Sequence, residues 1–143
     1  MLTDNKTLLR NTIEEIYNKG NLNLADELVS GNYVAHDSTT VNPGTGSNGL
    51  KNQVTTLRTA FPDLRLNIEE LLQDADTVSA RLTAQGTHKG NFLNIPATGR
   101  NIKTTGILIS HVKNGKLTDS YINWDAVTVL QQIGAIPAPG QAS

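Results

Sequence analysis

Asp125 is the residue of this chain whose type and position best suit acid–base chemistry. It ends the segment Leu117–Asp125, which follows an Asn114-Gly115 turn signal and contains the aromatic and β-branched residues typical of a β-strand. Alternate residues of a regular strand share a face, which predicts one row of side chains: Leu117, Asp119, Tyr121, Asn123 and Asp125. If this row lines a cavity, desolvation raises the pKa of the Asp125 carboxyl and makes it a usable acid or base near neutral pH.

The same carboxylate has a second interpretation as a helix cap. A helical pattern over residues 126–133 follows Asp125 directly, and Asp is a favoured N-cap. The sequence leaves both roles open. The acid–base role predicts that Asp125 faces a closed apolar cavity with a hydrogen-bond donor nearby.

Two histidines are further candidates for the same cavity. His88 ends an alternating row of apolar residues in the strand pattern 78–88, and His111 lies near the end of the pattern 102–113. Both are predicted to reach the cavity, where imidazoles can donate to an oxyanion or transfer protons. The alternatives are a buried histidine bonded to the backbone for His88 and a surface or interface residue for His111.

The third histidine, His36, is either a substrate contact or half of a structural pair with Asp37. Because the three histidines are far apart in the sequence and form no local ligand motif, no metal site is expected. Core packing is the expected fate of most of the aromatic residues. Trp124 alternates with Asp125, so we expect it to pack against a helix or a partner subunit. The predicted substrate-contacting side chains are Tyr121, Asn123, His36, Tyr33, Phe61 and Phe92.

The order of elements predicts an α+β fold. Helical patterns cover residues 4–18, after a cap at Thr3 or Asp4, then 22–30 before Gly31, and 47–61. A short extended piece spans 33–36 and a loop spans 38–47, whereas the later patterns indicate antiparallel strands at 64–73, 78–88, 102–113 and 117–125. Helices gathered on one face of a curved sheet make a cone with an internal pocket. We expect one domain over residues 1–143, with a frayed tail from about 135.

Composition limits the classes of partner. The chain has 12 basic and 13 acidic residues, a net charge of −1, and no run of either sign, so no nucleic-acid or membrane partner is expected. It has no cysteine, which removes thiol chemistry. The polar start and the lack of a long apolar run predict a cytoplasmic protein. The expected ligand is small and not highly charged.

Five segments together resemble the SnoaL-like polyketide cyclases, also called ester cyclases, of the nuclear-transport-factor-like superfamily. They are EEIYNKGNL (14–22), AFPDL (60–64), GTHKGNF (86–92), IPATG (95–99) and LQQIG (130–134). The resemblance covers nearly the whole chain. It implies the α+β cone and a homodimer formed through the sheets.

The resemblance also implies a role for Asp125. In these cyclases one Asp, six residues before a Gln-Gln pair, is the acid/base of an intramolecular aldol ring closure that needs no metal or other cofactor, and Asp125 stands at that place. Three positions depart from the family pattern: His111, where Arg or another polar residue is common, Asn94 in place of Gly, and Tyr121 in place of Trp. Pocket polarity and substrate are expected to differ accordingly.

Fold alone does not fix function, so two other classes stay open. A noncatalytic small-molecule binding protein would have the same cone without a desolvated carboxylate. A hydrolase or dehydratase would need a second acid/base group, for which Asp125 with His88 or His111 on opposite pocket walls is the candidate arrangement. The leading prediction is a cyclase acting on a small apolar carbonyl or ester substrate.

Overall fold

The computed structural model describes residues 4–140. The first helical segments are α1 (Asn5–Asn11), the π-helix η1 (Thr12–Asn18), the 3₁₀-helix η2 (Leu22–Leu24) and α2 (Ala25–Leu28). They are followed by β1 (Val29–Asp37), α3 (Gly46–Ala60), β2 (Arg65–Asp74), β3 (Thr77–Thr87), β4 (Asn101–Lys113), β5 (Lys116–Trp124) and α4 (Ala126–Gln132). Thr3, one of the two predicted caps, and residues 141–143 of the predicted tail lie outside the described residues.

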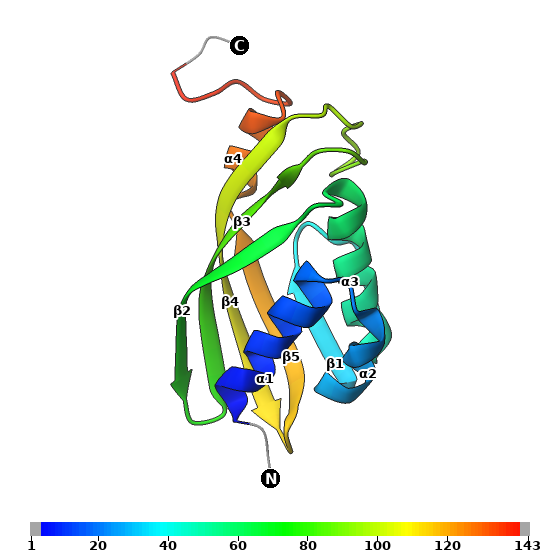
Figure 1. Ribbon diagram of the computed structural model, residues 1–143, viewed down its shortest axis with the longest axis vertical. Helices are drawn as coiled ribbons and strands as arrows, with labels where there is room; N and C mark the ends of the chain where they lie inside the picture. The colour runs from blue at the N-terminus through cyan, green and yellow to red at the C-terminus, as the bar shows by residue number, and fades with distance from the viewer. Residues whose placement is uncertain (1–3, 141–143) are drawn as a thin grey trace.

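The strands form one curved sheet in the order β1-β5-β4-β3-β2, with α1, α2 and α3 on one side of it (Figure 1). The predicted α+β class is therefore confirmed. One feature departs from the predicted antiparallel sheet, because β1 pairs with β5 in parallel, with His36 opposite Tyr121. No tight hairpin joins β1 to its neighbour, so turn geometry does not impose an antiparallel direction on it.

One local interaction and one long-range interaction hold the two ends of the first helical segments. The Asp4 carboxylate accepts hydrogen bonds from the backbone N–H groups of Lys6 and Thr7, as predicted for an N-cap. At the other end, the Asn18 side chain accepts from the N–H of Leu66 at 2.7 Å and donates to its carbonyl at 2.9 Å, which ties η1 to β2. The predicted end of the second helix at Gly31 is wrong, because α2 ends at Leu28 and Gly31 lies within β1.

Strict alternation along β3 and β4 builds the core. In β4 the buried side of the strand carries Ile102, Thr104, Gly106, Leu108, Ser110 and Val112, and the residues between them are exposed. The buried row of β3 consists of Val78, Ala80, Leu82 and Ala84 and is continued by His88, as predicted. Leu50, Val54 and Leu57 of α3 belong to the same core. The sheet and α3 therefore enclose the apolar interior of the cone.

A bulge in β5 reverses the faces of this strand. Ser120 pairs with Ser110, and Leu117 pairs with Val112, so β5 has one more residue than β4 between these pairs. Leu117 and Ser120 are consequently both buried although they are three positions apart. Uniform alternation from Leu117 to Asp125 was therefore a wrong expectation, because one extra residue moves every later side chain to the other face.

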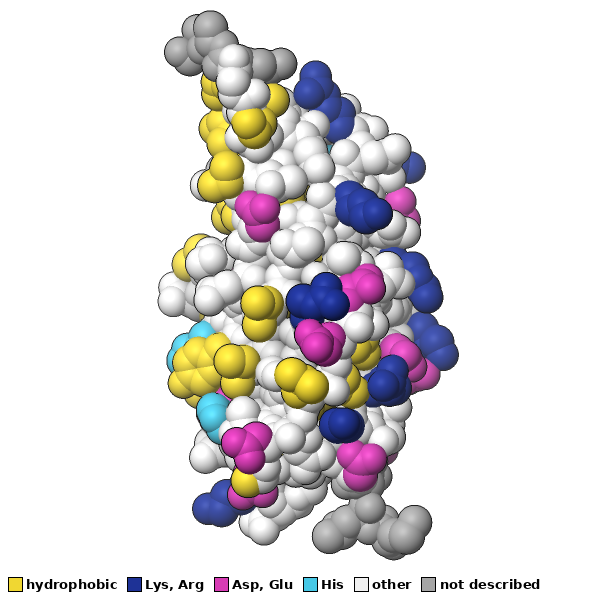
Figure 2. Space-filling view, turned by 90° about the vertical axis from the view of Figure 1, so that its left-hand side faces the viewer, with side chains coloured by type: hydrophobic (Ala, Val, Ile, Leu, Met, Phe, Trp, Pro, Cys, Tyr) yellow, Lys and Arg dark blue, Asp and Glu magenta, His cyan; other side chains and the backbone are white. Residues whose placement is uncertain are grey.

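The outer face of the sheet carries a band of exposed hydrophobic side chains. One row crosses the sheet from Leu72 through Ser79, Ile109 and Tyr121 to His36, each residue paired in register with the next. Leu72, Ile109 and Tyr121 are exposed, as is Ile107 in the adjacent row. Figure 2 shows hydrophobic side chains interspersed with charged ones on this side of the molecule.

Between residues 4 and 140, no helix has the length and apolar character needed to cross a membrane.

Candidate active site

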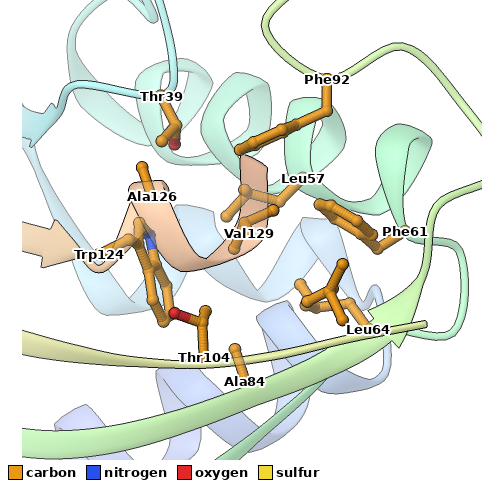
Figure 3. Close-up of a pocket in the computed structure, with 11 residues that line it drawn as sticks. Thr39, Leu57, Phe61, Leu64, Ala84, Phe92, Thr104, Trp124, Ala126 and Val129 are labelled. Carbon is orange, nitrogen blue, oxygen red and sulfur yellow. The ribbon is translucent and has the colours of Figure 1, made fainter. Parts of the chain in front are cut away.

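An apolar cavity lies between the sheet, α3 and α4 (Figure 3). Eleven residues line it: Thr39, Leu57, Phe61, Leu64, Ala84, Phe92, Ile102, Thr104, Trp124, Ala126 and Val129. Its volume is about 30 Å³ for the centres of water-sized molecules. This is room for about two waters and well below the roughly 150 Å³ of a protein cavity that accepts benzene. A ligand with an aromatic ring must therefore displace wall side chains when it enters.

Two of the predicted substrate-contacting residues, Phe61 and Phe92, line this cavity. Their ring centroids are 5.3 Å apart and tilted by 56°, which is a favourable aromatic arrangement. Phe61 is the C-cap residue of α3, and Phe92 lies on the connection between β3 and β4. Figure 3 shows Trp124 at one end of the cavity and Phe61 at the other.

Trp124 lines the cavity, although it was not among the predicted substrate contacts. It points away from the Asp125 face, as expected, and it lines the cavity together with Ala126 and Val129. Gly106 is its partner on β4, and a Cβ atom at Gly106 would lie only 2.4 Å from Cε3 of the indole. The apolar Ile122 and Trp124 alternate with the polar Asn123 and Asp125, and this alternation was the available signal for an inward row.

Asp125 is flanked in the sequence by two cavity-lining residues, but its own carboxylate faces solvent. It is the N-cap of α4, and it accepts from Thr128 N at 3.1 Å and from Thr128 Oγ1 at 2.6 Å. These hydrogen bonds hold the pKa of the Asp125 carboxyl below its usual value. The predicted rise in pKa is therefore wrong, because the side chain is not desolvated. The capping geometry predicted as the alternative is present.

The predicted row beside Asp125 also lies outside the cavity. Tyr121 and Asn123 are exposed, and together with Asp125 they line a shallow hollow on the outer face of the sheet that also includes Ile107 and Ile109. The expectation that this row lines an internal pocket is wrong. The physical reason is the bulge in β5, which turns Leu117 inward and the later members of the row outward.

His88 lies in the core next to the cavity. It is fully buried, and its ring centroid is 5.7 Å from that of Phe61. Thr98 N lies 3.3 Å from Nδ1 and donates to it, while Thr98 Oγ1 is 3.0 Å away. Because a backbone N–H can only donate, Nδ1 is the acceptor, and the neutral ring carries its proton on Nε2. This Nε2 has no hydrogen-bond partner among residues 4–140.

His111 and His36 belong to a different cluster on the outer face of the sheet. Nδ1 of His111 lies 2.7 Å from Oδ1 of Asp119, and the ring of His36 stacks on that of Tyr121 with centroids 4.2 Å apart. Both histidines are exposed. The expectation that His88 and His111 share one cavity is therefore wrong, because odd and even positions of β4 face opposite sides of the sheet.

A buried polar network lies deeper in the cone. Tyr17 donates to Oε1 of Gln53 at 3.0 Å, and Nε2 of Gln53 donates to Oδ2 of Asp37 at 3.1 Å. Thr39, which lines the cavity, donates to Oδ1 of Asp37 through its N–H and its hydroxyl. Asp37 is therefore bound mainly to Gln53 and Thr39 and not to its neighbour His36. The Gln53 link joins two segments that are far apart in the sequence and left no local motif.

Tyr33, another predicted substrate contact, is buried and does not line the cavity. Burial raises the pKa of its phenol to about 12, against a smaller opposing effect of a hydrogen bond with Ser120. Burial likewise raises the pKa of Tyr17 well above its ordinary value. In the part of the chain described, 4–140, no cluster of three or more His, Cys, Asp or Glu side chains is placed to hold a metal ion.

Comparison with known proteins identifies relatives of this chain. The family described as SnoaL-like polyketide cyclase matches residues 7–133. Aklanonic acid methyl ester cyclase DauD of Streptomyces sp. (strain C5) is 29% identical over 124 residues, which cover 84% of this chain and 76% of that protein. DnrD of Streptomyces peucetius, with the same described activity, is also 29% identical over 124 residues, covering 84% of each protein.

Solved structures share the fold. The structure of a proposed polyketide cyclase from Acidithiobacillus ferrooxidans is 30% identical, has a TM-score of 0.81, and aligns over 92% of this chain and 94% of that chain. TsrD from Streptomyces laurentii also has a TM-score of 0.81, at 24% identity, over 91% of this chain and 94% of that chain. The likeness to TsrD shows only that the two chains share a fold.

Proposed function

The chain belongs to the SnoaL-like polyketide cyclase family, and from this premise we propose that it catalyses an aldol-type ring closure in a small apolar carbonyl or ester substrate. The observation that carries the proposal is the apolar cavity between Trp124 and the Phe61–Phe92 pair, whose lining residues Trp124 and Ala126 flank Asp125, the N-cap of α4. Its relatives DauD and DnrD are, by name, cyclases of aklanonic acid methyl ester. An apolar wall suits a substrate of this class.

Asp125 is the proposed acid/base. Its carboxylate removes a proton from a carbon flanked by carbonyls, the resulting carbanion attacks a second carbonyl carbon to form the new C–C bond, and the alkoxide takes the proton back. The net reaction is an isomerisation, so it requires no oxidant, reductant or cofactor. His88 is proposed as a second polar group near the reacting centre, whereas His111, His36, Tyr121 and Asn123 lie on the opposite face of the sheet and have no proposed part in the reaction. Tyr33 is proposed to support the cavity wall from the core and not to contact the substrate directly.

The proposal requires a change at Asp125, because its oxygens are engaged by Thr128. Trp124 and Ala126, the residues on either side of Asp125, both line the cavity, so its backbone already lies at the cavity wall. A side-chain rotation that releases Thr128 would bring the carboxylate toward an entering substrate. Release also removes the hydrogen bonds that lower the pKa, which makes the carboxylate a stronger base.

The test is turnover of aklanonic acid methyl ester and of simpler aromatic β-keto esters, followed by chromatography and NMR because substrate and product have equal mass. Asp125→Asn keeps the shape and removes the basicity, so we expect a loss of about 100-fold or more. Thr128→Val removes the hydroxyl that holds the carboxylate, so it should keep or raise the activity. Parental turnover by Asp125→Asn would exclude this role.

A noncatalytic ligand-binding protein is the second candidate function. The observation in its favour is the exposed Asp125 carboxylate with its lowered pKa, which is what a purely structural cap requires. This candidate predicts that aromatic esters stabilise the protein thermally but are recovered unchanged. A hydrolase or dehydratase has less support, because His111 lies outside the cavity and supplies no second acid/base group there.

Assembly as a homodimer is proposed through the outer face of the sheet. The exposed Leu72, Ile107, Ile109 and Tyr121 form a band that a second copy could cover, and basic and acidic side chains are interspersed on this side of the molecule (Figure 2). Ile109→Lys should shift the mass measured by light scattering from dimer to monomer. A dimeric Ile109→Lys protein would place the interface elsewhere. The cytoplasmic location stays a proposal, which cell fractionation tests.

A further inference from the structure

One buried N–H group of a cavity-lining residue has no acceptor. Nε1 of Trp124 is inaccessible to solvent, and it makes no hydrogen bond to any residue between 4 and 140. Buried donors are nearly always paired, so an unpaired one indicates a missing partner. We propose that Trp124 is the residue that recognises the substrate carbonyl, by donating its indole N–H to a carbonyl oxygen of a ligand in the cavity. This inference rests on the proposed cyclase function and names a specificity-determining contact for it.

The other polar side chains of the cavity have already used their donors. Of the eleven lining residues, all of which are described, only Thr39, Thr104 and Trp124 have polar side chains. The Thr39 hydroxyl donates to Asp37, and the Thr104 hydroxyl donates to the Asp125 carbonyl at 2.8 Å. The indole N–H is therefore the one uncommitted side-chain donor of the lining. His88 Nε2 is also unpartnered, but His88 is not a lining residue.

The indole is held in place by its surroundings. Gly106 opposite Trp124 leaves just enough space for the ring, since a Cβ atom there would approach Cε3 to 2.4 Å. The backbone next to Trp124 is fixed by the hydrogen bond from Asp125 N to the Thr105 carbonyl at 2.9 Å. Rotation of the ring to solvent would break this packing. No polar atom of the lining is exposed to the empty cavity, so a ligand reaches the indole N–H only as it displaces the surrounding wall side chains, and the fixed donor then orients that ligand.

The lining also defines the chemical class of the ligand. No charged side chain lines the cavity, so an anion would lose its hydration without compensation. A neutral carbonyl group on a flat apolar body satisfies both the donor and the apolar walls. A bound water would satisfy the donor too, but it needs two to four polar partners, which this lining hardly provides.

The test uses two small neutral probes of matched shape. Acetophenone carries a carbonyl oxygen, and α-methylstyrene replaces that oxygen with CH₂ on the same planar skeleton. Trp124 is the chain's one tryptophan, so a ¹⁵N-labelled protein has a single indole N–H signal to follow. We expect acetophenone to bind about five- to tenfold more tightly than α-methylstyrene, as for one net hydrogen bond, and to move the indole proton downfield.

Trp124→Phe keeps an aromatic ring and removes the donor, so it should bind both probes equally while it remains folded by circular dichroism. Val127→Ala, at an exposed position of the first turn of α4 outside the lining, is the matched control and should keep the preference. Equal affinities in the parent protein, binding of neither probe, or a preference that survives Trp124→Phe would each overturn the inference.

The outcome is separable from that of the cyclase proposal. A carbonyl preference that depends on Trp124, together with no turnover of any ester, would support the role of the indole donor and refute the enzymatic function. Turnover that depends on Asp125, with kcat and KM unchanged in Trp124→Phe, would refute the role of the indole donor and support the enzymatic function. In the expected case Trp124→Phe raises KM or lowers kcat toward ester substrates by about the same factor as it weakens acetophenone.

Discussion

The contact between Gly106 and Trp124 allows a quantitative prediction. An alanine Cβ at position 106 would lie 2.4 Å from Cε3, 2.7 Å from Cζ3 and 3.1 Å from Cδ2 of the indole. Carbon atoms pack at about 3.5–4.0 Å, so the ring must move by roughly 1 Å. Overpacking of this kind costs about 1–3 kcal/mol, and the lower entropy of the unfolded alanine chain offsets about 0.4–1 kcal/mol.

We therefore expect Gly106→Ala to lower the free energy of unfolding by roughly 1–2 kcal/mol. At about 3 °C per kcal/mol for a chain of this size, the midpoint temperature should fall by about 3–6 °C. Urea unfolding followed by circular dichroism measures the change. Gly31→Ala is the matched control, because β1 offers open space around Gly31 and its backbone is not left-handed. It should leave stability nearly unchanged.

A double-mutant cycle identifies the cause of the loss. Trp124→Leu removes the atoms that an alanine at position 106 would meet, so Gly106→Ala should cost much less in that background. The coupling free energy should be of order 1–2 kcal/mol. Full stability of Gly106→Ala, or strictly additive effects in the cycle, would refute the close packing of the indole on β4. The same result would weaken the argument that the indole donor is fixed in the cavity.

Three further predictions concern the buried network and the titratable groups. Gln53→Leu leaves the Tyr17 hydroxyl and Oδ2 of Asp37 without their partner, so it should cost roughly 2–4 kcal/mol in urea unfolding; a loss below about 0.5 kcal/mol would mean that the network is not a stabilising one. Asp125→Ala should lower the midpoint temperature at neutral pH, and because the folded pKa is depressed, the difference from the parent should start to shrink near the unfolded pKa of about 3.9 and be lost as pH falls through the lower folded pKa. A difference that is constant from about pH 7 to about pH 3 would contradict the cap. Near-ultraviolet titration of the folded protein should show that Tyr33 stays protonated to about pH 12 and that the pKa of Tyr17 is well above its ordinary value, and stability should fall from about pH 10 upward because the unfolded phenols ionise first; ionisation of Tyr17 and Tyr33 near pH 10 in the folded protein would show that neither is buried.

Local patterns predicted much of the architecture. The Asp4 cap, the Asn114-Gly115 hairpin with both residues at positive φ, and the alternation along β3 and β4 are confirmed. Each depends on interactions within a few residues or on a strict period of two, which the sequence contains directly. The parallel pairing of β1 with β5 has no such local signal, because it joins segments about 85 positions apart in the sequence.

The candidate site was predicted in part. Phe61, Phe92 and His88 lie at or beside the cavity. Phe61 was predicted from a helix end, His88 from an apolar strand row, and Phe92 as an apolar residue of a connecting segment. Tyr121, Asn123 and Asp125 face outward because Thr118 is an extra residue in β5, a change that uniform alternation does not detect. The Gln53–Asp37 link was not predicted, because hydrogen bonds between side chains 16 residues apart leave no periodic pattern.

By itself, the sequence determined the order and type of most elements, the resemblance to a family, and the presence of a carboxylate at the start of the last helix. Tertiary structure alone decided which side of the last strand meets the cavity, and hence that the Trp124 indole lies inside and the Asp125 carboxylate outside. The physical reason is that secondary structure follows from local periodicity, whereas the facing of a bulged strand follows from its pairing with a neighbour.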